Sequence, residues 1–285
     1  MKRIFKTDSI RNIVHWKPGA ELDDISLLTL YRNILKVNNK SGANIKHNLL
    51  QGNLSLVEIR KLYSNTIISE FILNEESTAF LISVILQENA SPILHIGLMI
   101  IDKNPGGNVM GLLSIGNFCM AYEKLGPFHI TNITSTPSSI ESFDQVILNS
   151  WPGPDIGLKK PPPGYREIVR ILKSDYIEKY FPDADELEID LKRFVLSSNS
   201  EEMGFVTNFY KISRANNFKY NLFCRTWIDY DQEEDIIQVG KANWYIYWRA
   251  KIILFFIQRS LKKILIKKMH KETRTEEVND TKQAA

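Results

Sequence analysis

The densest group of polar side chains that could do chemistry lies where a predicted strand, Phe128–Thr134, gives way to a predicted helix near Pro137. The backbone N–H groups at the start of a helix favour a bound anion, such as a phosphate or a carboxylate. The hydroxyls at this corner are therefore candidates to hold an anionic ligand. Hydroxyl residues also cap a helix without any ligand, and this alternative stays open. The residues of the corner are Thr134, Ser135, Thr136, Ser138 and Ser139.

Two histidines in predicted central strands are candidates for a general base. His129 lies in the strand before the corner, and His95 lies in the apolar run Ile93–Asp102. Imidazole titrates near neutral pH, which suits it to accept a proton during a reaction. A histidine in a strand can equally be a hydrogen-bonded structural residue. The sequence therefore predicts His129 or His95 as the base only if the protein is an enzyme.

Several common catalytic and metal-binding motifs are absent from the sequence. There is neither a P-loop nor a G-x-G-x-x-G run, so nucleotide hydrolysis and a Rossmann-bound cofactor have no support. No histidine pair has metal-ligand spacing, and the two cysteines, Cys119 and Cys224, form no CxxC motif. The run Gly111–Gly116 lacks the G-x-S-x-G spacing of a nucleophile elbow. We expect no metal site and no tightly bound cofactor.

The first part of the chain predicts helices followed by an apolar strand. Residues 1–20 are expected to be a lead-in, and apolar residues recur with helical spacing from Glu21 onward. The pattern Ser55–Glu58 is a capping box that starts a second helix, expected to run towards Leu73. The β-branched run Thr78–Leu86 favours a buried strand.

The centre of the chain predicts a hairpin. Ile93–Asp102 and Val109–Ala121 are both apolar and flank a Pro-Gly-Gly turn, so we expect two antiparallel strands. The proline-rich residues 151–164 cannot form regular structure, and a helix is expected from Tyr165 to Tyr180. The fold class is therefore α/β or α+β, with a central mixed sheet and flanking helices. Further strands are expected at Glu188–Ser197, Gly204–Tyr210 and Ile236–Val239.

The segment Asn243–His270 is aromatic at its start, apolar in its middle and basic at its end, and it contains no acidic residue, glycine or proline. It predicts a helix about 40 Å long, with Ile246, Ile253, Phe256 and Ile257 on one face. Tryptophan and tyrosine followed by Lys and Arg are typical of a helix lying in a membrane interface. A helix docked on the protein's own core is the alternative.

Charge is distributed unevenly along the chain. From Lys241 onward the sequence contains eleven Lys/Arg and four Asp/Glu, a net charge of +7, whereas residues 1–240 carry a net charge of −4. We expect an anionic membrane surface as the partner, and no nucleic acid.

The start of the sequence lacks a secretory signal, and no uncharged stretch of about 20 apolar residues occurs. The expected location is the cytoplasm, on the inner face of a membrane. The expected units are a domain at 1–240, the helix at 241–271 and a disordered tail at 272–285.

The order of helix, helix, strand, hairpin, strand, polar corner and helix over residues 20–150 resembles the GNAT acyltransferase fold. In that family the fourth strand leads through a pyrophosphate-binding loop into a helix that holds the phosphates of acyl-CoA. The matching positions are Phe128–Thr134 as strand and Ser135–Ser139 as loop. The family's Q/R-x-x-G-x-G/A motif is replaced there by Ser, Thr and Pro. The resemblance implies acyl transfer, with acyl-CoA or another acyl donor as co-substrate.

Two hypotheses of different classes follow. The first is a GNAT-like acyltransferase at a membrane surface, acting on a lipid-like or long-chain acyl substrate, with the corner holding the donor. The second is a non-catalytic peripheral membrane or partner-binding protein that uses its basic helix. An enzyme whose C-terminal helix packs on its own core is a third option. A concave pocket at the corner distinguishes them, because an enzyme needs one and an adaptor does not.

Overall fold

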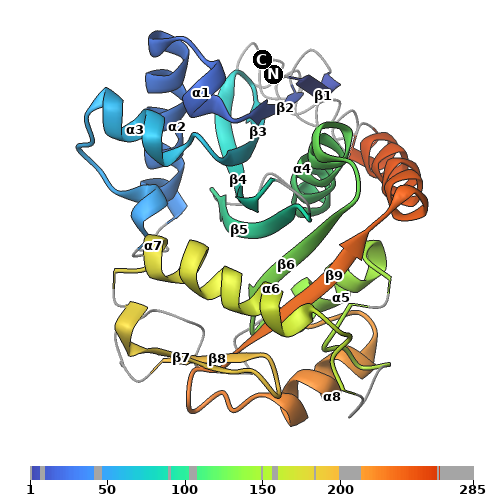
Figure 1. Cartoon of the computed structure of the whole chain (residues 1–285). Coiled ribbons are helices and arrows are strands. Elements are labelled where there is room, and N and C mark those ends of the chain that lie inside the picture. Colours follow the sequence, from blue (N-terminus) through green and yellow to red (C-terminus); the bar gives the residue numbers. More distant parts are fainter. Residues whose placement is uncertain are drawn as a thin grey trace, which may run out of the picture.

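In a computed structural model of the chain, the described residues include nine strands that form one mixed sheet (Figure 1). Their order across the sheet is β1-β2-β3-β4-β5-β6-β9-β8-β7. Neighbouring strands are antiparallel except β5 and β6, which are parallel. The strands are β1 Lys2–Lys6, β2 Ile10–Trp16, β3 Thr66–Leu73, β4 Glu76–Gln87, β5 Ile93–Ile101, β6 Phe128–Thr134, β7 Leu187–Asp190, β8 Val195–Ser198 and β9 Asp235–Ala242. The structure describes residues 2–6, 10–41, 47–88, 91–102, 108–148, 150–155, 160–182, 184–198, 213–261 and 263.

Helices cover both faces of this sheet. One face packs against α1 (Pro18–Glu21), α2 (Asp24–Ser41), α3 (Leu56–Leu62) and α6 (Tyr165–Leu172). The other face packs against α4 (Val109–Leu125), α5 (Pro137–Val146) and a C-terminal helix over residues 244–261. The helix α8 (Phe218–Trp227) packs on α5. The short elements are η1 Asn48–Leu50, the π-helix η2 Lys173–Ile177, α7 Glu178–Tyr180 and η3 Ala184–Glu186.

The largest correction to the sequence prediction is α4. Val109–Ala121 was expected to be the second strand of a hairpin, but it is the helix that connects β5 to the parallel strand β6. Every residue from Ile115 to Ala121 is buried, so this helix has no polar face and no helical periodicity to reveal it. Its Asn117 donates to the backbone carbonyls of Ile67 and Leu81 at 3.0 and 3.2 Å, which fixes it against the sheet.

Gly116 allows α4 to approach the sheet closely. A Cβ atom at this position would lie 3.2 Å from the Ser69 hydroxyl and 3.3 Å from a methyl group of Val14. Any side chain there would therefore push the helix outward. In the sequence, a glycine inside an apolar run favours a strand or a turn. In the structure, Gly116 lies at a contact between a helix and the sheet.

Other predictions were confirmed in type and corrected in extent. The strand Phe128–Thr134 has the predicted bounds, and the Ser55–Glu58 capping box starts α3. That helix ends at Leu62 rather than near Leu73, because β3 begins at Thr66 and pairs on both sides. The first 16 residues are not a lead-in but supply β1 and β2. The predicted strand Gly204–Tyr210 and the predicted tail at 272–285 lie outside the described residues.

The parallel pair β5 and β6 stays together for only four residue pairs, from Ile93 with His129 to Ile96 with Asn132. Beyond this point β5 continues along β4 to Ile101, while β6 continues along β9 to Thr134. The two strands therefore separate at Gly97, and the helices α4 and α5 begin beyond their separated ends (Figure 1).

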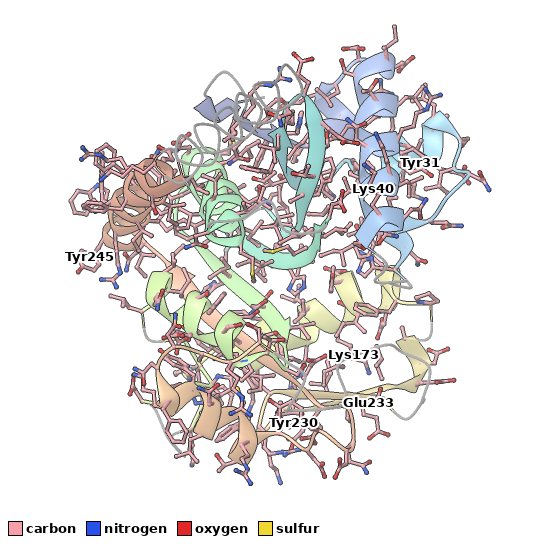
Figure 2. The ribbon with its side chains drawn as sticks, turned by 180° about the vertical axis from the view of Figure 1, so that it is seen from behind. Tyr31, Lys40, Lys173, Tyr230, Glu233 and Tyr245 are labelled. Atoms are coloured by element: carbon pink, nitrogen blue, oxygen red, sulfur yellow. The ribbon has the colours of Figure 1, made fainter. Side chains whose placement is uncertain are left out.

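The C-terminal helix has two opposite apolar faces. Its inner face belongs to the main core and contains Ile246, Ala250, Leu254, Ile257 and Leu261. Its outer face is 50–67% exposed, and Figure 2 shows Tyr245 there, at the outside of the molecule. Phe256 was predicted to share one face with Ile246 and Ile257, but it is exposed whereas they are buried. The outer residues are Trp244, Tyr245, Trp248, Ile252, Phe255 and Phe256.

Polar contacts hold this helix against α4. Tyr247 stacks on Tyr122 with ring centroids 4.6 Å apart, and its hydroxyl lies 3.0 Å from the Glu123 carboxylate. Lys251 forms an ion pair with the same carboxylate at 2.7 Å. Docking on the core, one of the two alternatives, is thus observed for residues 244–261. Within the described part of the chain, no helix has the length and apolarity that crossing a membrane would require.

Candidate functional site

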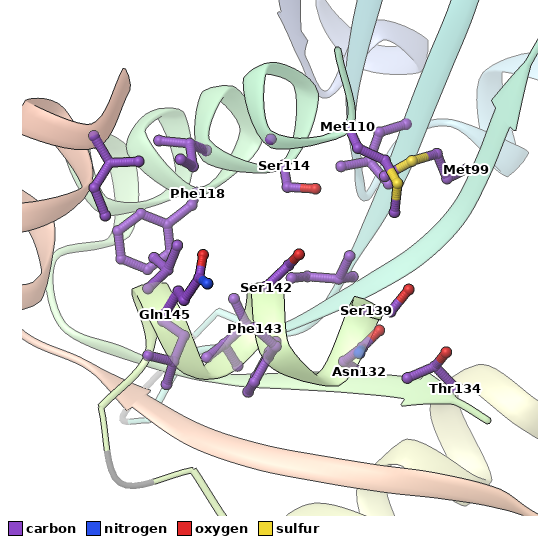
Figure 3. A pocket seen from close by; sticks show the side chains of 18 of the residues that line it. Met99, Met110, Ser114, Phe118, Asn132, Thr134, Ser139, Ser142, Phe143 and Gln145 are labelled. Atoms are coloured by element: carbon purple, nitrogen blue, oxygen red, sulfur yellow. The ribbon is translucent and has the colours of Figure 1, made fainter. Parts of the chain in front are cut away.

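A cavity of about 270 Å³ lies between α4 and α5, over the sheet face where β5 and β6 separate (Figure 3). The strands contribute Leu81, Ile96, Ile130 and Asn132 to its wall. The side chains of Ser114, Phe118, Ser142 and Phe143 point into the space from the two helices (Figure 3). The predicted corner Ser135–Ser139 begins α5, so the concave pocket that distinguishes an enzyme from an adaptor lies beside it.

The two ends of this cavity differ in polarity. Figure 3 shows Met99, Met110, Thr134 and Ser139 at one end, and Phe118 with Gln145 at the other. The first end also receives Asn108, the N-cap residue of α4, whose side chain accepts the N–H of Gly111 at 2.9 Å. It therefore carries hydroxyls, an amide and a helix start beside two methionines, whereas the second end combines the Phe118 ring with the exposed amide of Gln145. We call them the mouth and the inner end.

The structure divides the residues of the predicted polar corner. Thr134 and Ser139 line the mouth of the cavity, but Ser135, Thr136 and Ser138 do not. Ser135 is buried, and its carbonyl accepts the Tyr230 hydroxyl at 2.8 Å. The corner is thus partly a structural junction and partly cavity wall.

The helix start at this corner has little capacity for an anion. Pro137 has no N–H, while Ser138 and Ser139 donate theirs to the carbonyls of Ser213 and Thr136 at 3.3 and 3.0 Å. The N–H of Thr136 itself bonds to the Thr134 hydroxyl at 3.0 Å. The amides that were expected to bind a phosphate are therefore already used within the chain, which the local sequence could not show.

His95 lies on the opposite face of the sheet from the cavity and is buried. Its Nδ1 is 2.9 Å from the Thr131 hydroxyl, and its ring centroid is 4.0 Å from that of Tyr176. Burial, followed by the nearby His47, lowers the pKa of His95 to about 3. Its ring is therefore neutral at physiological pH, without the near-neutral pKa that the sequence argument assumed.

His129 is half-buried and also lies outside the cavity wall. Its Nδ1 is 3.1 Å from the Ser91 hydroxyl, and its ring meets the edge of Tyr165. Burial lowers the pKa of His129, and the positive charge of Lys241 adds to the effect. His129 and His95 lie two register positions apart on adjacent strands, and each ring has its own hydroxyl partner, Ser91 for His129 and Thr131 for His95.

Sequence reasoning missed a histidine–tyrosine pair behind the cavity. Burial lowers the pKa of His47 to about 4, and its Nδ1 accepts the N–H of Leu49 at 3.1 Å. The neutral ring therefore carries its proton on Nε2, which donates to the Tyr176 hydroxyl at 3.0 Å. A Cβ atom on Gly97 would lie 3.2 Å from this hydroxyl, so the phenol reaches the wall of the cavity from behind.

Only part of that pair had a sequence signal. A glycine inside the apolar strand that contains Gly97 indicates that another group approaches the backbone closely. Nothing in the sequence shows that the group is Tyr176, because a π-helix over Lys173–Ile177 orients it. Insertions of this kind are common at functional sites.

A hydrogen-bond chain orients Asn132 in the cavity wall. Asp144 Oδ1 accepts Gln238 Nε2 at 3.1 Å, and Gln238 Oε1 accepts Asn132 Nδ2 at 3.4 Å. This arrangement leaves the Asn132 carbonyl oxygen as an acceptor for a ligand. Burial raises the pKa of Asp144 to about 6. Among the described residues, no group of three or more His, Cys, Asp or Glu side chains is placed to hold a metal ion.

Comparisons with known proteins found no matching family model and no matching curated protein. Solved structures that match include an acetyltransferase of the GNAT family from Streptococcus pneumoniae, with 15% identity over 49% of this chain and 87% of that chain, at a TM-score of 0.32. An acetyltransferase from Salmonella typhimurium, which modifies the N-terminal serine of ribosomal protein L7/L12, matches at 15% identity over 46% and 74%, at 0.27. A ribosomal L7/L12 alpha-N-protein acetyltransferase in complex with coenzyme A matches at 14% identity over 46% and 74%, at 0.29.

Over about half of its length the chain is thus similar to an acetyltransferase of the GNAT family. The chain has a central mixed sheet flanked by helices, as expected. The TM-scores of these matches are too low to support an argument about chemistry, so the site is interpreted from its own geometry.

The buried His95 predicts a specific dependence of stability on pH. Between about pH 4 and 6.5 the unfolded chain binds a proton at this residue and the folded chain does not, because the folded pKa is about 3. Its contribution to stability is therefore present above pH 6.5 and lost as the pH falls below that value. We expect His95→Asn, which can keep the bond to Thr131, to reduce the slope of unfolding free energy near pH 5 by roughly 1.4 kcal/mol per pH unit.

Denaturant unfolding at several pH values measures this slope. The half-buried His129 provides the matched control, and His129→Asn should change the slope less. An unchanged slope in His95→Asn would show that His95 titrates normally in the folded protein.

Proposed function

We propose that this protein is an acyltransferase that binds an acyl donor, such as an acyl-CoA, in the cavity between α4 and α5. One observation supports this most strongly: the cavity lies where β5 and β6 separate, with hydroxyls and a helix start at its mouth and with Phe118, Ile253 and Ile257 farther along its wall. An acyl donor has the same polarity, with an anionic carrier at one end and a hydrocarbon group at the other. The donor is a co-substrate in this proposal, not a tightly bound cofactor.

The start of α4 suits the anionic part of such a donor better than the start of α5. β5 is the fourth strand of the run that starts at β2, and α4 is the helix that follows it. The comparison of element order in the sequence assigned the family's fourth strand to Phe128–Thr134, which is β6 and not β5. It did so because Val109–Ala121 was counted as a strand. The segment before α4 reads Lys103-Asn104-Pro105-Gly106-Gly107-Asn108, which has the first glycine of the family's motif at Gly106 but has Lys in place of Gln or Arg and Asn in place of the last Gly or Ala.

The histidines remain proposals for the proton-accepting group. His95 has the closer link to the cavity, because its ring lies against Tyr176 and the Tyr176 hydroxyl lies beside Gly97 in the wall. His129 is more accessible but is not itself a residue of the cavity wall. Whether His95 or His129 accepts the proton, the acceptor of the acyl group would approach from the sheet face on which the histidine lies.

We further propose that the reaction takes place at an anionic membrane surface, as on the cytoplasmic leaflet. The outer face of the C-terminal helix exposes two tryptophans, a tyrosine and two phenylalanines. So much exposed apolar surface is unusual for a helix at the surface of a protein. Arg259 lies over the Phe255 ring at 5.4 Å, and the exposed Lys263 follows it. Aromatic rings with adjacent cations are what an interfacial helix presents to lipid headgroups.

The donor site is tested by filling the mouth of the cavity. Ser142 lines the cavity and is exposed, so Ser142→Trp should fold and place its indole in the cavity. We expect the affinity for an acyl-CoA, measured by calorimetry, to fall at least about tenfold, because the ring occupies the ligand's volume. Ser138→Trp, on the same helix but outside the cavity wall, is the control. Loss of binding in Ser138→Trp alone would place the donor at the corner instead.

The membrane surface is tested by vesicle co-sedimentation of the full chain. The double substitution Trp248→Ser and Phe255→Ser removes apolar area from the outer face only, so we expect binding to anionic vesicles to fall at least about tenfold without loss of thermal stability. Binding should also weaken as salt rises. Ile25→Ser on α2 removes another exposed apolar side chain and should have no effect. Equal sedimentation of the double variant and the unaltered chain would exclude this face as the membrane contact.

A further inference from the structure

We propose that the inner end of the cavity is a subsite for the hydrocarbon chain of the acyl group, and that Ile253 and Ile257 of the C-terminal helix set the chain length it accepts. This inference rests on the proposed acyl transfer and adds the class of acyl group, one longer than acetyl. Both residues belong to the cavity wall, although they lie more than 100 residues from the other wall residues in the sequence.

The cavity is larger and longer than a two-carbon group requires. Cavities of about 150 Å³ with an aliphatic and aromatic lining already accommodate benzene, and this one measures about 270 Å³. Its wall includes Asn108 and Phe118 of the same helix, ten residues apart, a separation of about 15 Å along the helix axis. An elongated space of this kind matches an extended alkyl chain better than a compact group.

The C-terminal helix borders the inner end, where the apolar side chains of Phe118, Ile253 and Ile257 outnumber the single amide of Gln145. Figure 3 shows this helix passing on the Phe118 side of the cavity. Arg249 Nε donates to the carbonyl of Gln145 at 3.1 Å, which ties the helix to the end of α5. The contacts of Tyr247 and Lys251 with Glu123 tie it to the end of α4. Ile253 and Ile257 therefore form a fixed wall, and the free end of a bound chain would meet them.

A fixed apolar wall makes a quantitative prediction about chain length. Each methylene that enters the inner end should strengthen binding by about fourfold, the value for a buried methylene. The gain should stop at the length at which the chain reaches Ile253 and Ile257, because a longer chain must displace a packed helix. The length profile of affinity should therefore rise and then fall sharply.

The experiment measures binding of saturated fatty acids of increasing length to the full chain, by calorimetry below their critical micelle concentrations. Ile253→Trp should shift the best length to shorter chains, and Ile257→Ala should shift it to longer ones. Ile252→Trp alters the exposed outer face of the same helix and should leave the profile unchanged. Thermal unfolding identifies any variant that fails to fold, and the opposite shift expected for Ile257→Ala keeps the test valid if Ile253→Trp does not fold.

An identical length profile in all four proteins, or no binding of any fatty acid, would overturn the subsite. The outcomes for the proposed function are separate. Turnover of acetyl-CoA without binding of longer chains would contradict only the subsite. Fatty acids that bind with shifted profiles, in a protein that transfers no acyl group from any acyl-CoA, would contradict only the proposed reaction.

Discussion

The parallel pairing of β5 with β6 is the constraint on which the rest of the structure depends. Two consecutive parallel strands need a crossover connection, and α4 is that connection. The pairing ends at Ile96 and Asn132 because each strand then follows a different antiparallel neighbour. The separation leaves a space over the sheet between α4 and α5 that the core side chains do not fill. The candidate site is thus a consequence of topology. A few polar residues at its mouth distinguish that end of the cavity from the other.

The C-terminal helix connects this site to the surface of the molecule. Its inner face completes the main core and supplies two residues of the cavity wall, while its outer face exposes a continuous aromatic surface. The sequence left two alternatives for this segment, a membrane-interface helix or a helix docked on the core. The structure shows the docked helix and leaves its opposite face available, so the two alternatives are compatible. A donor or product with a hydrocarbon chain would then bind beside the helix whose outer face we propose to contact a membrane.

The sequence predicted the elements whose signals are local and missed those that depend on distant partners. The strand Phe128–Thr134 and the capping box at Ser55 were predicted correctly, because strand composition and capping act over a few residues. The helix α4 was missed because it is buried on nearly all sides and lacks amphipathic periodicity. That error, together with the missed strands β2 and β3, displaced the expected ligand loop from the start of α4 to the start of α5. His47 and Tyr176, 129 positions apart, could be paired only through the fold.

The central claim is that an acyl donor lies between α4 and α5 with its chain directed at the C-terminal helix. Photo-crosslinking tests it most directly, with an acyl-CoA that carries a diazirine at the end of its chain and peptide mapping by mass spectrometry. The account predicts labelling at Phe118, Ile253 or Ile257, which is prevented by excess unlabelled acyl-CoA. Labelling that competes with acyl-CoA but falls at Tyr165–Tyr176, or at the corner Ser135–Ser138, would contradict the account.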